Sequence, residues 1–195
     1  MCVLGGQLME YVEPIRDVES INAIKDILKK HSKRDLLLFV LGINTGIRIS
    51  DLLSLKVEDV WDEKGIKEFL YLKETNSGET KACYLNNNVQ QALEDYLNSH
   101  DFLGSDYLFK SKKNNLPITR QQAYRIINTA AKEVGIPGKI GTHTLRKTFG
   151  YHAYRKGIAI SILMGIYHHH TSSETLRYIG IDKNEKPLIK VDVNL

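Results

Sequence analysis

The sequence predicts an α+β domain that is mostly α-helical and contains one small three-stranded antiparallel sheet. Apolar residues recur at helical spacing in the first quarter of the chain and again through its second half. Between these regions, short strand-like stretches alternate with turn signals. The 195 residues suffice for one substantial domain. We expect it over residues 13–181, between a poorly ordered N-terminal extension (1–12) and a C-terminal tail (182–195) without helical periodicity.

Three helices are expected ahead of the sheet. The first covers residues 17–30, with Asp17 as a suitable N-cap and an apolar stripe behind it. The second, more buried helix covers residues 36–44 and is broken at Gly46. A short third helix follows, with Arg48 at its start.

The sheet is predicted from three strand-like stretches at residues 57–61, 67–73 and 80–85. Glu63-Lys-Gly65 separates the first two stretches, and Asn76-Ser-Gly78 separates the last two. Asn-Ser-Gly between two such stretches favours a hairpin.

The remainder of the chain is predicted to be helical. The clearest helix spans residues 119–134, because Thr119 and Gln122 form a capping box and apolar residues follow at helical spacing. Apolar spacing and turn residues indicate four more helices, at residues 87–99, 142–157, 160–166 and 172–178.

Composition permits a nucleic-acid partner without demanding one. The net charge is +4 and the pI is near 8.9. No apolar run reaches membrane-spanning length, and no signal peptide is evident, so we expect a cytoplasmic protein without a membrane partner. Cys2 and Cys83 lack metal-ligand spacing, which favours reduced thiols. The basic stretch Lys110 to Pro117 is either a solvated loop or a loop that contacts phosphates.

Polar residues that suit phosphate chemistry are spread along the chain. Arg48 follows a turn within an apolar stretch, and Asp51 lies three positions on, where a helix would let the two meet. The plainer interpretation is a structural Arg–Asp pair. His143 and Arg146 are also three apart, so both leave one side of a helix whose first turn favours an anion. Their plainer interpretation is an ordinary surface pair.

Two further segments need the same weighing. Three consecutive histidines, His168 to His170, suggest a metal site, but adjacent residues do not share a helical face, and no carboxylate or cysteine lies at a useful offset. One functional histidine among them, His169, is the stronger hypothesis, and no metal or other cofactor is expected. Tyr178, taken alone, is a packing tyrosine.

Taken together, these segments resemble the catalytic domain of the tyrosine recombinases, the phage integrase family. Thr-Gly-Ile-Arg48-Ile-Ser-Asp-Leu resembles the family's first-arginine motif, and Thr-His143-Thr-Leu-Arg146-Lys-Thr-Phe resembles its His-x-x-Arg motif. His169 precedes Tyr178 by nine residues, as in the family, and Leu-Arg-Tyr178-Ile-Gly resembles the nucleophile segment. The resemblance covers roughly residues 13 to 181, and it implies a mostly helical domain with a small antiparallel sheet.

The resemblance implies that the protein is a site-specific DNA recombinase of bacterial or phage origin, acting at the nucleoid. Tyr178 would attack a DNA phosphate and form a 3′-phosphotyrosine, while Arg48 and Arg146 bind the nonbridging oxygens. His143 would help to deprotonate the tyrosine or hydrogen-bond the phosphate, and His169 would donate to a nonbridging oxygen. Asp51 would orient Arg48. The implied partners are double-stranded DNA and other protomers, with a free monomer, a tetramer at synapsis and a tail exchanged between protomers. The residues expected to bind DNA are Lys110, Lys112, Lys113, Arg120 and Lys147.

Two departures from the family pattern leave an alternative open. The family's active-site lysine falls on Asn76 here, and Lys73 is the nearest candidate to replace it, while Lys81 lies across the turn. Family members usually also carry an N-terminal DNA-clamping domain, whereas here only about a dozen residues precede the expected catalytic domain. The alternative is therefore a cleavage-impaired relative, or an isolated catalytic fragment, that binds DNA or a partner recombinase. In a different class, the chain is a plain DNA-binding module or a metalloenzyme that uses the three histidines.

Overall fold

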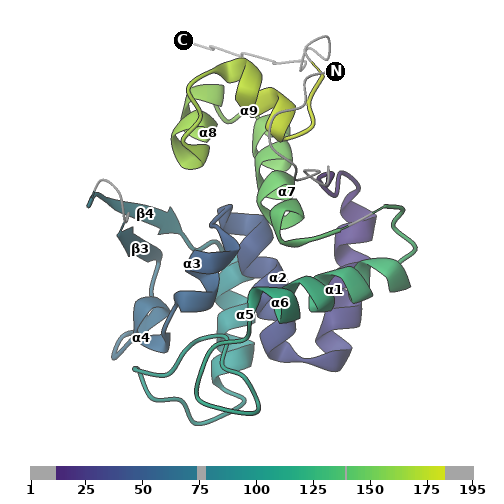
Figure 1. Cartoon of the computed structure of the whole chain (residues 1–195). Helices are drawn as coiled ribbons and strands as arrows, with labels where there is room; N and C mark the ends of the chain where they lie inside the picture. The colour runs from purple at the N-terminus through teal and green to yellow at the C-terminus, as the bar shows by residue number, and fades with distance from the viewer. Residues whose placement is uncertain (1–11, 74–77, 139, 183–195) are drawn as a thin grey trace, which may run out of the picture.

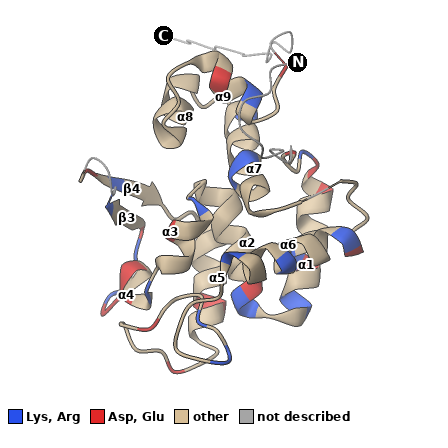
Figure 2. Cartoon of the chain, viewed as in Figure 1, with Lys and Arg blue, Asp and Glu red and all other residues tan. Residues whose placement is uncertain are grey.

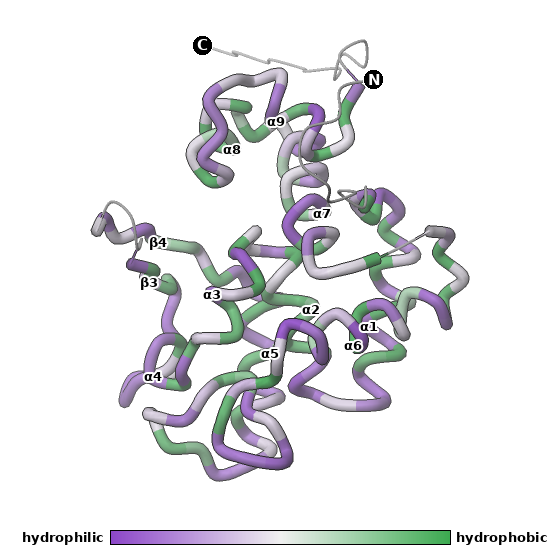
Figure 3. The backbone as a smooth tube through the Cα atoms, in the orientation of Figure 1, coloured by the Kyte–Doolittle hydropathy of each residue, from purple (hydrophilic) through white to green (hydrophobic). Residues whose placement is uncertain are grey.

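The computed structural model describes residues 12–73, 78–138 and 140–182, and the long helix α2 lies at the centre of its packing. Helix α2 (Lys33–Thr45) packs against α1 (Val18–His31), α5 (Asn87–Leu97) and α7 (Thr142–Arg155) (Figure 1). Hydrophobic positions along α2 are consistent with this central place (Figure 3).

The first two helices are set by their caps. The Asp17 carboxylate accepts hydrogen bonds from the backbone amides of Glu19 and Ser20, as predicted for the start of α1. Ser32 ends α1 and also caps α2, so α2 begins three residues earlier than its apolar run indicated. Gly46 ends α2 with a φ of 65°, a left-handed conformation that glycine adopts without strain.

The predicted three-stranded sheet is wrong in its first strand. Residues Val57–Val60 form a helical turn, α4, which β1 (Trp61–Asp62) follows directly. Val57 and Val60 are both buried and three apart, which is helical spacing, and the Asp59 carboxylate accepts a hydrogen bond from the Lys56 amide at 2.7 Å to cap the turn. The prediction relied on the strand propensity of the two valines. The capped helical turn outweighs that propensity here.

The strands instead form two separate hairpins. Strand β1 pairs with β2 (Gly65–Ile66), and β3 (Phe69–Lys73) pairs with β4 (Thr80–Tyr84), both antiparallel. In the second hairpin Lys73 lies opposite Thr80. Asn76 lies outside the described residues.

The predicted helices of the second half are confirmed. After α3 (Ile49–Ser54) and α5 come α6 (Arg120–Glu133), α7, α8 (Ile160–Tyr167) and α9 (Ser172–Tyr178). The capping box of α6 is present, since the Thr119 amide donates to Gln122 Oε1 at 2.8 Å and the Gln122 amide donates to Thr119 Oγ1 at 3.2 Å.

Two hydrophobic clusters fill the body of the domain, and a third lies under its C-terminal end. That third cluster is centred on Leu163, Tyr167, Ile179 and Ile181, with side chains of α7 packed against it. Helices α8 and α9 therefore sit together on the far part of α7 (Figure 1). No helix in the described ranges is long and apolar enough to cross a bilayer.

Candidate active site

A cavity of about 320 Å³ gathers side chains from several separate parts of the chain. They come from the starts of α3 and α6, from α7, from the end of α8 and the segment after it, and from α9. Six residues that the sequence singled out line it, together with Ile49, Ser50, Thr142 and Tyr167; the six are Arg48, Arg120, His143, Arg146, His169 and Tyr178.

Arg146 is the most firmly held of these side chains. It is only 9% exposed, and its guanidinium donates to the carbonyl of Gly46 and, at 2.8 Å, to that of Ile166. Its Cζ lies 4.6 Å from the centre of the Tyr167 ring. Burial lowers the pKa of Arg146, but arginine stays protonated in proteins, so a fixed positive charge faces the cavity.

Arg48 reaches the cavity from the N-cap position of α3, where its side chain is exposed. The expected pairing of Arg48 with Asp51 is absent: both lie in the described part of the chain, and no hydrogen bond or ion pair joins them. Arg48 has extended backbone angles outside the helix, so the i,i+3 geometry of a helix does not apply. Asp51 instead accepts a hydrogen bond from the Ser50 hydroxyl at 3.3 Å.

His143 lies in the first turn of α7, beside other positive groups. Burial lowers its pKa, and the charges of Arg120, Lys147 and Arg146 lower it further. The same cations favour an anion in the cavity, because they raise the positive potential that a bound phosphate would meet. Across the whole described chain, lysines and arginines are spread over many elements rather than gathered on one helix (Figure 2).

His169 is placed by the chain turn after α8. His168 adopts a left-handed conformation with a φ of 59°, which ends α8 and brings the next residue towards α9. His169 Nδ1 lies 3.1 Å from the Thr175 hydroxyl, and its ring centre lies 5.1 Å from that of Tyr178. Burial lowers the pKa of His169, while Glu174, with an oxygen 4.0 Å from Nε2, opposes that shift.

Tyr178 is half-buried against this group of side chains. Burial raises the pKa of its phenol, whereas Arg146, through its charge and a hydrogen bond, and the charge of Arg48 act in the opposite direction. Lys147 Nζ lies 5.1 Å from the centre of the Tyr178 ring. The environment therefore supplies positive charge where a phenolate would form.

Several residues predicted to contact DNA or to act as an acid lie apart from the cavity. Lys73 ends β3 on an exposed position. Lys110 forms a 2.8 Å ion pair with Asp106, so part of its charge is already offset within the protein. Lys112 and Lys113 are exposed, as expected for a solvated loop. Lys147 is only 8% exposed and faces Tyr178 instead of solvent.

Sequence reasoning missed Tyr167, which also lines the cavity. The signal was weak, because the tyrosine ends an apolar helix and reads as ordinary core. No group of three or more His, Cys, Asp or Glu side chains among the described residues could hold a metal ion.

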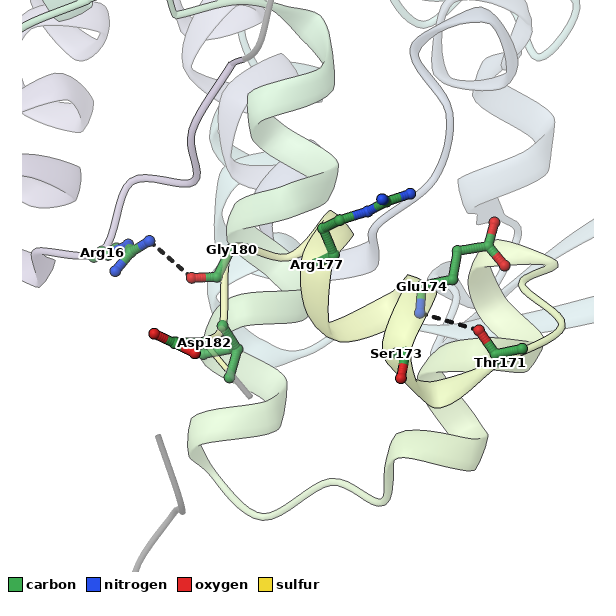
Figure 4. A pocket seen from close by; sticks show the side chains of 8 residues that line it. Arg16, Thr171, Ser173, Glu174, Arg177, Gly180 and Asp182 are labelled. Carbon is green, nitrogen blue, oxygen red and sulfur yellow. Dashed lines mark hydrogen bonds between the residues drawn. The ribbon is translucent and has the colours of Figure 1, made fainter. Parts of the chain in front are cut away.

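A second cavity, of about 500 Å³, lies around the C-terminal end of α9, where the segment before α1 meets it (Figure 4). Its lining mixes both signs of charge, with Arg16 and Arg177 against Glu174 and Asp182. It shares no residue with the cavity that holds Tyr178. This second cavity therefore lies between α9 and the segment before α1, and is separate from the cavity that Arg146 lines.

Comparisons with known proteins agree with this arrangement. A model of the phage integrase family matches residues 15–185. The chain is 42% identical over 176 residues to the probable integrase/recombinase YoeC of Bacillus subtilis, covering 90% of this chain and 93% of YoeC. It is 29% identical to the tyrosine recombinase XerA of Pyrococcus furiosus, covering 84% of this chain but only 56% of XerA.

Solved structures show the same fold. The crystal structure of XerA recombinase superimposes with a TM-score of 0.72 at 22% identity, covering 89% of this chain and 62% of that one. XerH recombinase bound to its difH substrate in a post-cleavage complex gives a TM-score of 0.70 at 19% identity, covering 91% of this chain and 51% of that one. The chain thus spans nearly all of YoeC and about half to two thirds of the longer recombinases.

Proposed function

Because this chain belongs to the phage integrase family, the tyrosine recombinases, we propose that it cleaves and rejoins DNA through a covalent bond to Tyr178. One observation carries the proposal most directly. Arg48 and Arg146, which are far apart in sequence, line one cavity with His143, His169 and Tyr178. Two guanidiniums, two imidazoles and a phenol in one cavity match what a phosphoryl transfer to tyrosine needs.

In the proposed reaction, the Tyr178 oxygen attacks the scissile phosphorus, and the bond from phosphorus to the 5′ oxygen breaks. The phenol loses its proton to His143 or to solvent, and the leaving 5′ oxygen gains a proton to become a hydroxyl. Arg48 and Arg146 bind the nonbridging oxygens and offset the charge that grows on them in the transition state. A 5′ hydroxyl from a partner strand then reverses the step, so no ATP is consumed.

Among the tyrosines, the contacts favour Tyr178 over Tyr167 as the nucleophile. Tyr167 is 5% exposed, and its hydroxyl donates to the backbone carbonyl of Arg146 at 2.9 Å. Burial raises the pKa of Tyr167 strongly, so its phenolate is disfavoured. Tyr178 is less buried, and the positive charge of Arg146 opposes the rise in its pKa that burial causes.

The proposal includes partners and a place of action. We infer that the substrate is double-stranded DNA in the cytoplasm, at the nucleoid, and that protomers assemble as a tetramer at synapsis from free monomers. Arg120, which lines the cavity, would contact the DNA backbone there. Lys73 would serve as the acid for the leaving oxygen.

A cleavage-impaired, DNA-binding relative is the second candidate. Two features favour it: Asn76 occupies the position expected for the acid, and Lys73 does not line the cavity. Loss of a general acid typically slows a reaction about 10²- to 10⁴-fold.

A nicked suicide substrate, in which the strand beyond the cleavage site diffuses away, separates the two candidates. We expect wild-type protein to form an adduct that survives denaturation. Tyr178→Phe should abolish the adduct while DNA binding stays unchanged, and Tyr124→Phe, a change at an exposed tyrosine, should leave both intact. Binding by wild type with no adduct would establish the impaired relative instead.

A further inference from the structure

Tyr167 contacts three of the five side chains that form the proposed catalytic group. Its ring lies under the Arg146 guanidinium at 4.6 Å, and its centre is 5.0 Å from the Tyr178 ring and 5.5 Å from the His169 ring. The side chain is 5% exposed, in the third hydrophobic cluster. It is therefore a buried surface against which the Arg146, His169 and Tyr178 side chains pack.

The hydroxyl and the ring of Tyr167 both contact Arg146. Its hydroxyl donates to the Arg146 carbonyl at 2.9 Å, while its ring face lies against the Arg146 guanidinium. The hydroxyl fits against α7 because residue 150 is glycine, where a Cβ would overlap the phenol. This arrangement leaves the arginine side chain little freedom, because the ring closes one face of the guanidinium and two backbone carbonyls bind its nitrogens.

We propose that Tyr167 is a positioning residue for cleavage, which holds Arg146 in the orientation that binds the scissile phosphate. The inference rests on the proposed function and adds a residue to it. A planar guanidinium recognises phosphate through donors in its own plane, so a tilt weakens the contact where charge develops. With one face against Tyr167 and two nitrogens bound to backbone carbonyls, the Arg146 guanidinium is held in the lining of the cavity that Tyr178 shares.

The contact between Tyr167 and Arg146 has a predictable size. Desolvated cation–π contacts are worth enough to change a rate roughly 5- to 30-fold. We expect that loss for Tyr167→Leu or Tyr167→Met in single-turnover adduct formation at saturating DNA, with DNA affinity unchanged. Tyr167→Phe keeps the ring and should stay within about threefold of wild type, since a neutral hydrogen bond contributes only modestly.

A matched control separates this role from general damage to the core. Tyr96 is also 5% exposed but packs beside Phe102, in a different hydrophobic cluster. Tyr96→Leu makes the same chemical change away from the cavity. It should lower the unfolding temperature while leaving the adduct rate, measured well below that temperature, at the wild-type value.

A substrate with a methylphosphonate at the scissile position supplies the decisive readout. The methyl group removes one nonbridging charge, so the reaction depends less on Arg146. The rate ratio of wild type to Tyr167→Leu should shrink several-fold on this substrate. Each variant's folded fraction cancels when its own two rates are compared, so a folding defect leaves the ratio unchanged, and an unchanged ratio would overturn the inference.

These experiments can separate failure of the Tyr167 positioning role from failure of the proposed recombinase function. If wild type forms an adduct and both Tyr167→Leu and Tyr167→Met match it, the positioning role is wrong and the recombinase proposal survives. If wild type forms no adduct with either substrate, the proposed function itself fails, and the role of Tyr167 fails with it.

Discussion

Arg16 donates a hydrogen bond to the carbonyl of Gly180 at 2.8 Å, joining the segment before α1 to the end of the helix that carries Tyr178 (Figure 4). The same segment is fixed to α7, because the Ile15 amide donates to Thr148 Oγ1 and the Ile15 carbonyl lies 2.9 Å from His152 Nε2. Helix α9 is thus supported from the N-terminal side of the domain as well as by α8.

The first prediction concerns this support. Arg16→Gln removes the bond to Gly180, and because Arg16 is half-exposed the cost should not exceed about 1 kcal/mol. We expect backbone amides of α9 to exchange hydrogen up to roughly fivefold faster. Lys29→Gln makes an equal change of charge at an exposed position of α1, and should leave hydrogen exchange in α9 as in wild type. Equal exchange in both variants would show that Arg16 does not hold the helix.

The second prediction tests how closely α7 and the α8–α9 unit pack. At Gly150 an added Cβ would overlap the Tyr167 hydroxyl and lie 2.6 Å from Ile179 Cγ2. Gly150→Ala should therefore lower the free energy of unfolding by about 1–3 kcal/mol, as overpacked cores do. Urea denaturation measures this directly.

Gly165 is the control for that substitution. It lies within α8, and a Cβ there meets nothing within 4 Å. Gly165→Ala should raise the free energy of unfolding by up to about 1 kcal/mol, because alanine is the better helix former. Two variants that destabilise equally would contradict the packing described here.

Local patterns predicted the helices and the β3–β4 hairpin well, and failed at the first predicted strand. Asp17, Thr119 and Gly46 act as the cap, capping box and helix stop that their residue types indicate. The error at Val57–Val60 arose because two valines three apart suit either a strand or a helical turn, and Asp59 decides between them by capping. Such a choice depends on one hydrogen bond that residue counting does not weigh.

The third prediction concerns pH. Burial and neighbouring cations lower the pKa of His143 below its ordinary value of 6.5, so its imidazole is mostly neutral at that pH. If His143 accepts the Tyr178 proton, adduct formation should fall on the acid side with a midpoint below pH 6.5. His143→Asn should be slower and lose that acidic limb. A midpoint above 6.5 would contradict the assignment.

The stability of the folded protein should also depend on pH through the histidines of the site. His143 and His169 both have lowered pKa values, so the folded protein binds fewer protons than the unfolded chain below pH 6.5. Their contribution therefore becomes destabilising as pH falls through 6.5. We expect the unfolding temperature to drop between pH 7.5 and 5.5, and to drop less in His143→Asn.

The fourth prediction identifies the acid for the leaving oxygen. Lys73→Ala should slow adduct formation about 10²- to 10⁴-fold if Lys73 donates that proton. A substrate with sulfur in place of the bridging 5′ oxygen should restore most of the rate, because a thiolate leaves without protonation. Lys81, whose Nζ lies 3.2 Å from the Gly165 carbonyl, provides the comparison. Rescue of Lys81→Ala rather than Lys73→Ala would move the assignment to β4.

Residue types in the motifs suggested which side chains form the candidate site. They did not predict how those side chains are oriented or that they line one cavity. The spacing of His143 and Arg146 placed both on one side of α7, as found, because a helix fixes that relation. The same rule failed for Arg48 and Asp51, since Arg48 lies just outside its helix. Lys147 and Tyr167 needed coordinates, because whether a lysine or tyrosine faces solvent or a neighbouring ring depends on elements distant in sequence.

The last prediction concerns the basic loop between α5 and α6. Lys112 and Lys113 are exposed, whereas Lys110 pairs with Asp106 at 2.8 Å and lies on the bridge between residues 110 and 117. If the loop contacts DNA phosphates, Lys112→Ala with Lys113→Ala should reduce the slope of log affinity against log salt by about 2, since each phosphate contact adds about 0.9.

Lys110→Ala should behave differently from that pair. Its ion pair is partly buried, so its loss should lower the free energy of unfolding by up to about 1 kcal/mol and leave the salt slope unchanged. Fluorescence anisotropy with a labelled duplex, at salt concentrations from 50 to 300 mM (roughly the range over which counterion release dominates), measures the slopes. Equal slopes for wild type and the double variant would exclude this loop from the proposed DNA interface. Arg120, which lines the cavity, would then remain as a proposed contact to the DNA backbone.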